Sequence, residues 1–357
     1  MADGQKHICC AEGKQMQYRP WSHLPVDILN LIIRRLPKII DQIYFRFVCK
    51  NWHLAKVPQY EGNVPWLLGL QWDFDINNGG AMTQLSSFHI PSPNNQFHIT
   101  KSIVKKEEEF FGAGICASKY GWLLLQKSNK SFFYSPFSRK AIKLPNMEIN
   151  FNRATFSSSP TSPDCICFVI ESSKSIAKIR ISICSPGGLE WRTIAVDGFK
   201  RAVEDVVYSN GCFYCVFSGG VLGAFYVAGR DWRVLTDMEP IIGIQFWARS
   251  QLVESNGELL LVCRSTNFHV FRFDWSEMGW IEIHKLGNQA LFLGCTSFAI
   301  AAEWKTSALA DRIYYHGECH RSYFYYLPTN KKYACEDFYP WVVHDAMERV
   351  WIEPPSF

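Results

Sequence analysis

The sequence has little net charge and no long apolar run near its start. Its 37 basic and 33 acidic residues leave a net charge of +4 over 357 residues, which is too small an excess to predict nucleic-acid binding. The first 20 residues contain no long apolar stretch, so we expect no secretory signal. Charged residues make up 20% of the chain and hydrophobic residues 48%, a balance that excludes a mainly disordered protein.

Paired metal-ligand motifs are also scarce. A four-ligand zinc site normally needs two closely spaced cysteine pairs, or one such pair with spaced histidines. The 13 cysteines provide a single CxxC motif, Cys212-x-x-Cys215, and it lies in an apolar, strand-like run. The other close spacings are Cys9-Cys10 and Cys165-x-Cys167. We therefore predict reduced, buried, structural cysteines rather than a metal centre, and no cofactor.

One stretch is long enough to cross a membrane. Val206 to Gly229 carries no formal charge over 24 residues. However, Ser209-Asn210-Gly211 and Ser218-Gly219-Gly220 divide it into short pieces, and Asn-Gly and Gly-Gly between apolar runs are typical of β-hairpins. We predict three successive strands, Val206–Tyr208, Cys212–Phe217 and Val221–Val227, and no membrane partner.

Helical patterning is confined to the segment from residue 21 to residue 57. Residues 1–20 are polar and without periodicity, which predicts a flexible tail. A first helix is predicted from Pro25 to Pro37, because Ile28, Leu29, Ile32 and Leu36 form one apolar stripe. After a turn through Lys38–Asp41, a second helix is predicted to carry Phe45, Val48, Cys49 and Trp52 and to stop before Pro58.

Two short apolar helices cannot form a stable core by themselves, since the segment has fewer than about 40 residues. They could pack on the rest of the chain, or they could dock a second protein. Residues 21–60 contain six basic and two acidic residues, whereas residues 61–357 contain one more acidic than basic residue. This local basic excess favours an acidic partner.

The motifs of this segment resemble an F-box. They are Trp21-Ser-His-Leu24-Pro25-Val-Asp27-Ile28-Leu29, Ile32-Ile33-x-x-Leu36-Pro37 and Phe45-Arg46-Phe47-Val48-Cys49-Lys50-x-Trp52. The resemblance implies binding to a Skp-family adaptor and, through it, to a cullin ubiquitin ligase. It also implies a set of adaptor-facing residues: Leu24, Pro25, Ile28, Leu29, Ile32, Leu36, Val48, Cys49 and Trp52. Trp52 is the strongest candidate for an interface anchor.

The rest of the chain reads as repeated β units. With 26 phenylalanines, 15 tyrosines and 13 tryptophans, the sequence is rich in side chains that suit pleated surfaces. Short strands recur with a period of about 40–45 residues, the range of a four-stranded propeller blade. Trp191, Trp232 and Trp280 each open a fourth strand. The recurrence of these units along the chain predicts about six four-stranded blades. The three tryptophans are predicted to pack between neighbouring blades.

Further motifs are similar to the KIB-type, kelch-like β-propeller of plant F-box proteins. They include Gly121-Trp-Leu-Leu-Leu125, Ser135-Pro-Phe-Ser-Arg-Lys140, Val270-Phe-Arg-Phe-Asp-Trp275 and Trp351-Ile-Glu-Pro-Pro355. The sequence therefore predicts a small α-helical F-box followed by an all-β domain. The expected boundaries are residues 1–20 for the tail, 21–60 for the F-box and 61–357 for the propeller. The resemblance implies a non-catalytic, cytoplasmic or nuclear substrate receptor of an SCF ubiquitin ligase, with an unidentified protein target.

An enzymatic propeller, a hydrolase or an oxidoreductase with an accessory docking segment, is the alternative. No catalytic constellation supports it. His316-x-x-x-His320 with Cys319 has the best metal-like spacing, but on a strand the two histidines would lie roughly 13 Å apart. Gly219-Gly-Val-Leu-Gly223 lacks the Lys-Ser/Thr of a phosphate-binding loop and is predicted to be a hairpin. The slightly acidic propeller also disfavours nucleic acid.

Overall fold

The protein is described from a computed structural model. The described residues are 21–36, 39–55, 64–75, 81–91, 97–104, 112–147, 150–173, 175, 177–236, 250–302, 304–316, 322–334 and 348–354. The predicted tail, residues 1–20, therefore lies outside them. The chain divides into two compact units, residues 1–60 and residues 61–357.

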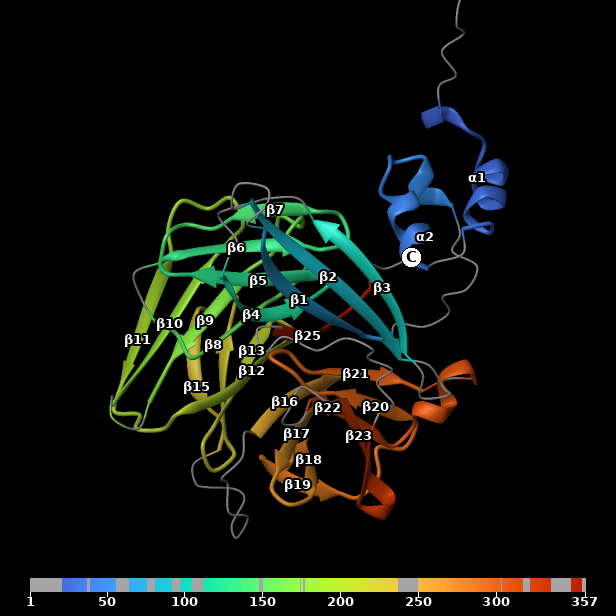
Figure 1. Cartoon of the computed structure of the whole chain (residues 1–357). Helices are drawn as coiled ribbons and strands as arrows, with labels where there is room; N and C mark the ends of the chain where they lie inside the picture. Colours follow the sequence, from blue (N-terminus) through green and yellow to red (C-terminus); the bar gives the residue numbers. More distant parts are fainter. Residues whose placement is uncertain are drawn as a thin grey trace, which may run out of the picture. The chain divides into compact units, whose positions relative to one another are not determined.

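The first unit is helical. Its elements within the described residues are the 3₁₀-helices η1 (Trp21–His23) and η2 (Trp52–Leu54) and the α-helices α1 (Val26–Ile33) and α2 (Ile39–Arg46) (Figure 1). Pro25 is the N-cap of α1 and Asp27 lies in its first turn, as the pattern predicted. The prediction of a second helix through Trp52 is wrong, because α2 begins earlier and ends at Arg46.

The end of α2 has a local cause. The amides of Phe47 and Val48 donate to the carbonyls of Tyr44 and Phe45, which is the tighter i to i+3 pattern typical of a helix terminus. The chain then reverses, and the ring of Trp52 lies 4.3 Å from that of Phe45 between centroids. A continuous helix would separate these two rings by about two turns. Packing of the tryptophan therefore outweighs continuation of the helix.

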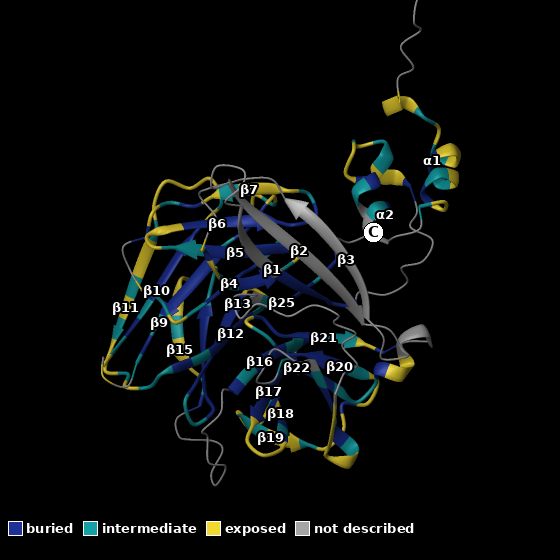
Figure 2. Ribbon diagram, viewed as in Figure 1, coloured by how far each residue is buried: buried dark blue, intermediate teal, exposed yellow. Residues whose placement is uncertain are grey.

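The second unit consists of six sheets in the described residues (Figure 1). Five have the four strands that were predicted for a blade, and the sixth has five strands. The predicted architecture is confirmed in the described residues, where a small α-helical unit precedes an all-β unit of propeller sheets. Burial falls from the inner strands to the outer ones, as in Figure 2, where β11 and β19 carry exposed residues while β13 is buried throughout.

The first three sheets contain the following strands. In the first, of order β25-β1-β2-β3, they are β1 (Trp66–Asp75), β2 (Ala81–Pro91), β3 (Phe97–Val104) and β25 (Glu348–Ile352). In the second they are β4 (Gly114–Lys119), β5 (Trp122–Lys127), β6 (Lys130–Ser135) and β7 (Lys140–Lys143). In the third they are β8 (Arg153–Phe156), β9 (Cys167–Glu171), β10 (Lys178–Cys184) and β11 (Arg192–Asp197).

The remaining sheets complete the circuit. The fourth contains β12 (Val203–Ser209), β13 (Cys212–Phe217), β14 (Val221–Tyr226) and β15 (Asp231–Val234). The fifth contains β16 (Ser250–Ser255), β17 (Glu258–Arg264), β18 (Phe268–Asp274) and β19 (Gly279–Ile283). The sixth, of order β21-β20-β22-β23-β24, contains β20 (Gln289–Phe292), β21 (Phe298–Ala301), β22 (Arg312–His316), β23 (Ser322–Tyr326) and β24 (Lys331–Ala334), with η5 (Trp304–Leu309) and η7 (Leu327–Thr329) in its connections.

The hairpins between successive strands have the predicted chemistry. Asn210-Gly211 and Asn256-Gly257 both adopt positive φ at two consecutive positions, which is the requirement of a tight type I′ hairpin. Gly219 and Gly220 turn β13 into β14, so this glycine-rich run is a hairpin. The uncharged stretch from Val206 onward therefore forms three strands of one sheet, β12, β13 and β14, and that prediction is confirmed.

Each core cluster of the propeller joins two neighbouring sheets. Phe168 of β9 stacks on Phe213 of β13, and Leu252 of β16 packs in one cluster with Val216 of β13. The tryptophans of the outer strands strengthen these contacts, since the indole of Trp191 donates to the Pro145 carbonyl and that of Trp280 to the Gly220 carbonyl, each in the preceding sheet. The prediction that these tryptophans pack between blades is confirmed.

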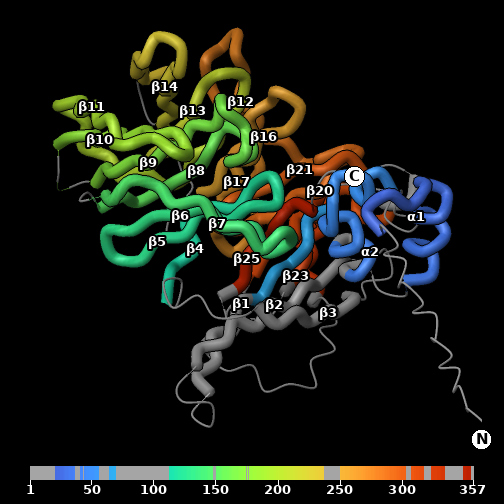
Figure 3. The backbone as a smooth tube through the Cα atoms, turned by 90° about the horizontal axis from the view of Figure 1, so that it is seen from above, coloured from blue at the N-terminus to red at the C-terminus, as the bar shows by residue number. Residues whose placement is uncertain are grey.

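The ring is closed by the last strand. β25 pairs with β1, so that Trp351 lies opposite Leu67 in the antiparallel register. Figure 3 shows β25 beside β1 in the view from above. Trp351 is fully buried, and its ring centroid lies 5.0 Å from that of Phe292 in the sixth sheet. One residue beyond the strand, the Glu353 carboxylate accepts a hydrogen bond from the Tyr120 amide of the second sheet.

We expect Trp351→Ala to destabilise the propeller by about 3–5 kcal/mol, because truncation of a fully buried tryptophan removes its packing and leaves a cavity at the closure. Urea unfolding measures the loss. Leu189→Ala is the control, since Leu189 is 96% exposed and its truncation should change the free energy of unfolding by less than about 0.5 kcal/mol. Equal stability of the two variants would contradict this account of closure.

Candidate functional site

The helical unit has a small core of its own. Leu29 and Ile33 of α1, Phe45 of α2 and Ala55 are buried together. Four partly buried side chains pack around them: Leu24, Ile32, Leu36 and Trp52. With so few buried side chains, the core is just sufficient to hold the two helices and the segment after them against each other.

Hydrogen bonds between side chains and backbone hold the ends of this unit together. The Trp52 indole donates to the carbonyl of Trp21 at 2.8 Å, and the Asn51 amide donates to the carbonyl of Leu24 at 2.7 Å. The Arg46 guanidinium donates to the carbonyl of His53 at 2.9 Å. The start of the unit is thereby tied to its end, so the exposed residues between them keep a defined arrangement.

The nine predicted adaptor-facing residues fall into three groups. Pro25, Ile28 and Val48 are exposed, and Ile28 and Val48 have 42% and 60% of their surface accessible. Five are partly buried: Leu24, Ile32, Leu36, Cys49 and Trp52. Leu29 is fully buried. An adaptor-facing role for Leu29 does not fit this conformation, because its side chain fills the core between the helices.

Four further apolar residues of the unit are exposed and were missed by the sequence analysis. They are Trp21, Leu31, Phe47 and Leu54, with exposed fractions between 38% and 62%. The helical period could have identified Leu31, which lies three residues after Ile28 and therefore next to it on α1. Phe47 and Leu54 follow the end of α2, where the helix was wrongly extended. Together with Ile28 and Val48, these four side chains give the unit an unusually apolar surface.

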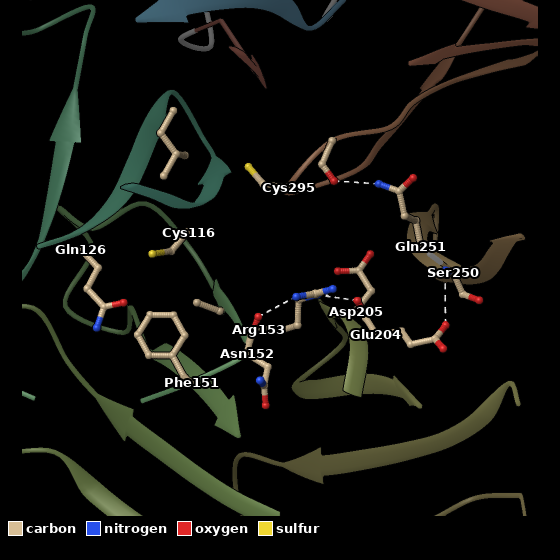
Figure 4. Close-up of a pocket in the computed structure, with 13 residues that line it drawn as sticks. Cys116, Gln126, Phe151, Asn152, Arg153, Glu204, Asp205, Ser250, Gln251 and Cys295 are labelled. Carbon is tan, nitrogen blue, oxygen red and sulfur yellow. Dashed lines mark hydrogen bonds between the residues drawn. The ribbon is translucent and has the colours of Figure 1, made fainter. Parts of the chain in front are cut away.

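The propeller carries a cavity of about 300 Å³ where its inner strands begin (Figure 4). The residues that line it come from five sheets: Ile115, Cys116, Gln126, Phe151, Asn152, Arg153, Ala154, Glu204, Asp205, Ser250, Gln251, Gly294 and Cys295. The cavity therefore lies at one end of the central channel, where a ring of strand starts converges. None of these residues was singled out from the sequence.

Polar side chains of the cavity connect neighbouring inner strands. One oxygen of Asp205 on β12 accepts a hydrogen bond from the Leu252 amide of β16 at 2.8 Å. Glu204 accepts from the Ser250 amide of the same strand at 3.2 Å. Arg153 of β8 donates through Nε to the carbonyl of Glu204. These contacts join the third, fourth and fifth sheets around the cavity.

Asp205 carries the most informative charge of the site. Burial raises the pKa of this fully buried carboxyl to about 7, against the hydrogen bonds from Val206 and Leu252 and the charge of Arg153, which lower it. The neighbouring Glu204 carboxylate raises the pKa of Asp205 further. Near pH 7 the group is therefore shared between its neutral and ionised forms.

We expect the propeller to lose stability as the pH rises. The unfolded chain releases the Asp205 proton near pH 4, whereas the folded chain keeps it up to about pH 7. The contribution of Asp205 therefore lowers the free energy of unfolding progressively from about pH 4 to about pH 7, and above pH 7 it stays constant. From pH 5 to pH 8 the loss is about 2–3 kcal/mol. Urea unfolding at both pH values checks it. Asp205→Asn should lack this component, and an identical pH slope in the variant would refute the assignment.

The four closely spaced cysteines of the propeller are poor nucleophiles. Cys165, Cys167, Cys212 and Cys215 are buried, as predicted, whereas Cys9 and Cys10 lie outside the described residues. Burial raises the pKa of Cys165 to about 11 and also raises that of Cys167, Cys212 and Cys215. These thiols stay protonated at neutral pH, and a thiol reacts as its thiolate. They pack in the core and provide no activated group.

Metal binding has no support from the described part of the chain, where no group of three or more histidine, cysteine or acidic residues could hold an ion. His316 ends β22 and its ring stacks on Trp351. Cys319 and His320, which completed the metal-like spacing in the sequence, lie outside the described residues.

Comparison with known protein families covers both units. The F-box domain model matches residues 21–55, and the KIB1-4 β-propeller model matches residues 87–334. The chain belongs to the KIB1-4 β-propeller family. It combines this propeller with an N-terminal F-box, as the sequence motifs predicted.

Similar proteins from Arabidopsis thaliana are named F-box proteins, and one of them is named an F-box/kelch-repeat protein. The chain is 28% identical to F-box protein At3g56470, over 95% of its own length and 90% of that protein. It is 26% identical to F-box/kelch-repeat protein At1g57790, over 94% and 95%. A shorter relative, F-box protein At4g12382, is 46% identical and covers 40% of this chain and 94% of its own length. In the described residues, no helix is long and apolar enough to span a membrane.

Proposed function

We propose that this protein is the substrate-recognition subunit of an SCF ubiquitin ligase, in which residues 21–60 dock a Skp-family adaptor and residues 61–357 recruit a protein target. The observation that carries the proposal is the apolar surface of the helical unit. Ile28, Leu31, Val48 and Leu54 each expose between 42% and 60% of their surface, whereas four hydrophobic residues are buried in the described part of the unit. A large exposed apolar surface of this kind is typical of a site that binds another protein.

The adaptor would bury these exposed side chains and contact the partly buried Trp52 at their margin. Aromatic residues that are held in place before binding lose little conformational freedom, and the packing of the Trp52 ring against Phe45 holds it in this way. Arg34, Arg35 and Lys50 are exposed in the same unit, in keeping with an acidic adaptor surface. Through the adaptor, the chain joins a cullin.

In this function the chain is not the catalyst. It holds a target lysine at high effective concentration near a ubiquitin-charged enzyme, and the bond-forming chemistry belongs to other subunits. Burial raises the pKa values of the Cys165 and Cys263 thiols, so neither residue provides the reactive thiolate that the ubiquitin-transfer step of a cysteine-dependent ligase needs. Ubiquitin ligation of this kind places the protein in the cytoplasm or the nucleus.

Adaptor capture tests the proposal. We expect Ile28→Asp combined with Val48→Asp to reduce recovery of a purified Skp-family adaptor by at least tenfold, because each aspartate would be desolvated in the interface. Both positions are exposed, so the fold should be retained, and unchanged circular dichroism would verify this. Leu189→Asp, at a 96% exposed position of the propeller, is the control and should bind like the wild type. Unchanged capture by the double variant would reject the proposal.

A further inference from the structure

The cavity at the end of the propeller channel has two chemically different sides. One side is uncharged, with the ring of Phe151 and the side chains of Ile115 and Ala154, and the amides of Gln126 and Asn152 lie beside them. The other side presents Glu204, Ser250 and Gln251. Figure 4 shows Phe151 and Glu204 on opposite sides, with Arg153 between them. A ligand that fits both sides has an apolar body and a polar end.

The polar side is acidic. Glu204 is partly exposed toward the cavity, and one of its oxygens accepts from the backbone amide of Ser250. Among the described residues, Arg153 is the one cationic side chain that lines the cavity with it. The Gln251 amide group donates to the Gly294 carbonyl at 2.7 Å, which commits its nitrogen to the protein. Acceptor groups therefore dominate the polar side, and they suit a ligand that donates hydrogen bonds and carries positive charge.

Arg153 does not convert the site into an anion clamp. Its Nε donates to the Glu204 carbonyl and its Nη1 to the Asn152 carbonyl at 2.7 Å, so two of its donors are held by the backbone. Its charge also acts on the buried carboxyl of Asp205, which lines the cavity beside Glu204. Because the pKa of Asp205 is about 7, the two carboxyls together carry more negative charge than Arg153 balances, and this excess grows as the pH rises through 7.

The size of the cavity restricts the ligand. A volume of about 300 Å³ lies at the lower end of the range for ligand pockets, roughly 300–1,000 Å³. The cavity can accept one long side chain but not a folded surface. A lysine or arginine side chain combines an apolar stem with a cationic, hydrogen-bond-donating end, and so matches both sides.

We propose that this cavity binds a lysine or arginine side chain from an extended segment of the target protein, with the stem against Phe151 and the cationic group at Glu204. The inference deepens the proposed function, on which it rests, because it assigns the target-binding position of the propeller and a chemical requirement for the target. Backbone groups of the segment would lie at the channel mouth, and the basic side chain would select it.

Peptide binding to the full-length protein tests the inference. The probes are fluorescein-labelled Gly/Ser nonapeptides that carry lysine, arginine, norleucine or glutamate at the central position, and anisotropy gives each dissociation constant. We expect the lysine or the arginine peptide to bind at least tenfold more tightly than the norleucine peptide, which keeps the apolar stem and lacks the cation. Binding of the glutamate peptide in preference to the basic peptides would overturn the inference in favour of an anion site.

The matched variants are Glu204→Gln and Glu277→Gln. Glutamine at position 204 has the same shape and can still accept from the Ser250 amide, so the strand contact is retained while the charge is lost. Glu277 is an exposed residue of the β18–β19 hairpin, and its replacement makes the same change in net charge away from the cavity. We expect Glu204→Gln to weaken the basic peptide at least tenfold and Glu277→Gln to leave it unchanged. Equal binding by both variants would overturn the inference.

Four further measurements separate the possible failures. Urea unfolding of Glu204→Gln establishes that the variant is folded, and Phe151→Ser, on the opposite side of the cavity, provides an independent loss of peptide binding. Free n-butylamine is tested as a competitor of the labelled peptide. If it displaces the peptide at the same concentration as unlabelled peptide does, the idea that the ligand is a segment of a protein is rejected. Adaptor capture by Glu204→Gln should equal that of the wild type. Loss of peptide binding with intact capture therefore tests the cavity alone, whereas loss of capture by the helical double variant tests the ligase proposal alone.

Discussion

Packing between consecutive sheets is the interaction on which the propeller depends. No single central core exists in the described residues; instead, each cluster of buried side chains lies between one sheet and the next. A sheet can bury both faces in this way only if it has a neighbour on each side, and a linear array would leave two apolar faces exposed. The contact of Trp351 with Phe292 removes that penalty, because it joins the sixth sheet to the first.

The same arrangement explains which strands were predictable. β13 reads as an apolar run because both of its faces lie between sheets, and its predicted bounds, Cys212–Phe217, agree with the structure. The inner strands β4 and β8 were missed. They are short, and they carry Ser118, Arg153 and Thr155, because the edge of an inner strand faces the channel rather than another sheet. Because of these polar residues, the sequences of β4 and β8 lack the apolar pattern that predicts a strand.

The two candidate sites differ in how far the sequence could predict them. The predicted adaptor-facing set follows from a helical stripe within about 35 consecutive residues. The structure altered it in three ways: Leu29 is buried, four apolar residues outside the set are exposed, and the chain reverses after Arg46, where Trp52 contacts Phe45. The cavity draws Cys116, Arg153, Glu204 and Gln251 from four different sheets. These residues are far apart in the sequence and form no motif. They come close together only in the folded propeller, so the sequence could not predict the cavity.

The pairing of β25 with β1 has a consequence for synthesis of the protein. The strand that completes the first sheet is made almost 300 residues after the F-box, which at about 5–20 residues per second corresponds to roughly 15–60 s of translation. During that interval the nascent propeller has two open edges, and the apolar partners of Trp351 are without cover. The helical unit is therefore synthesised well before β25 can pair with β1 and close the propeller.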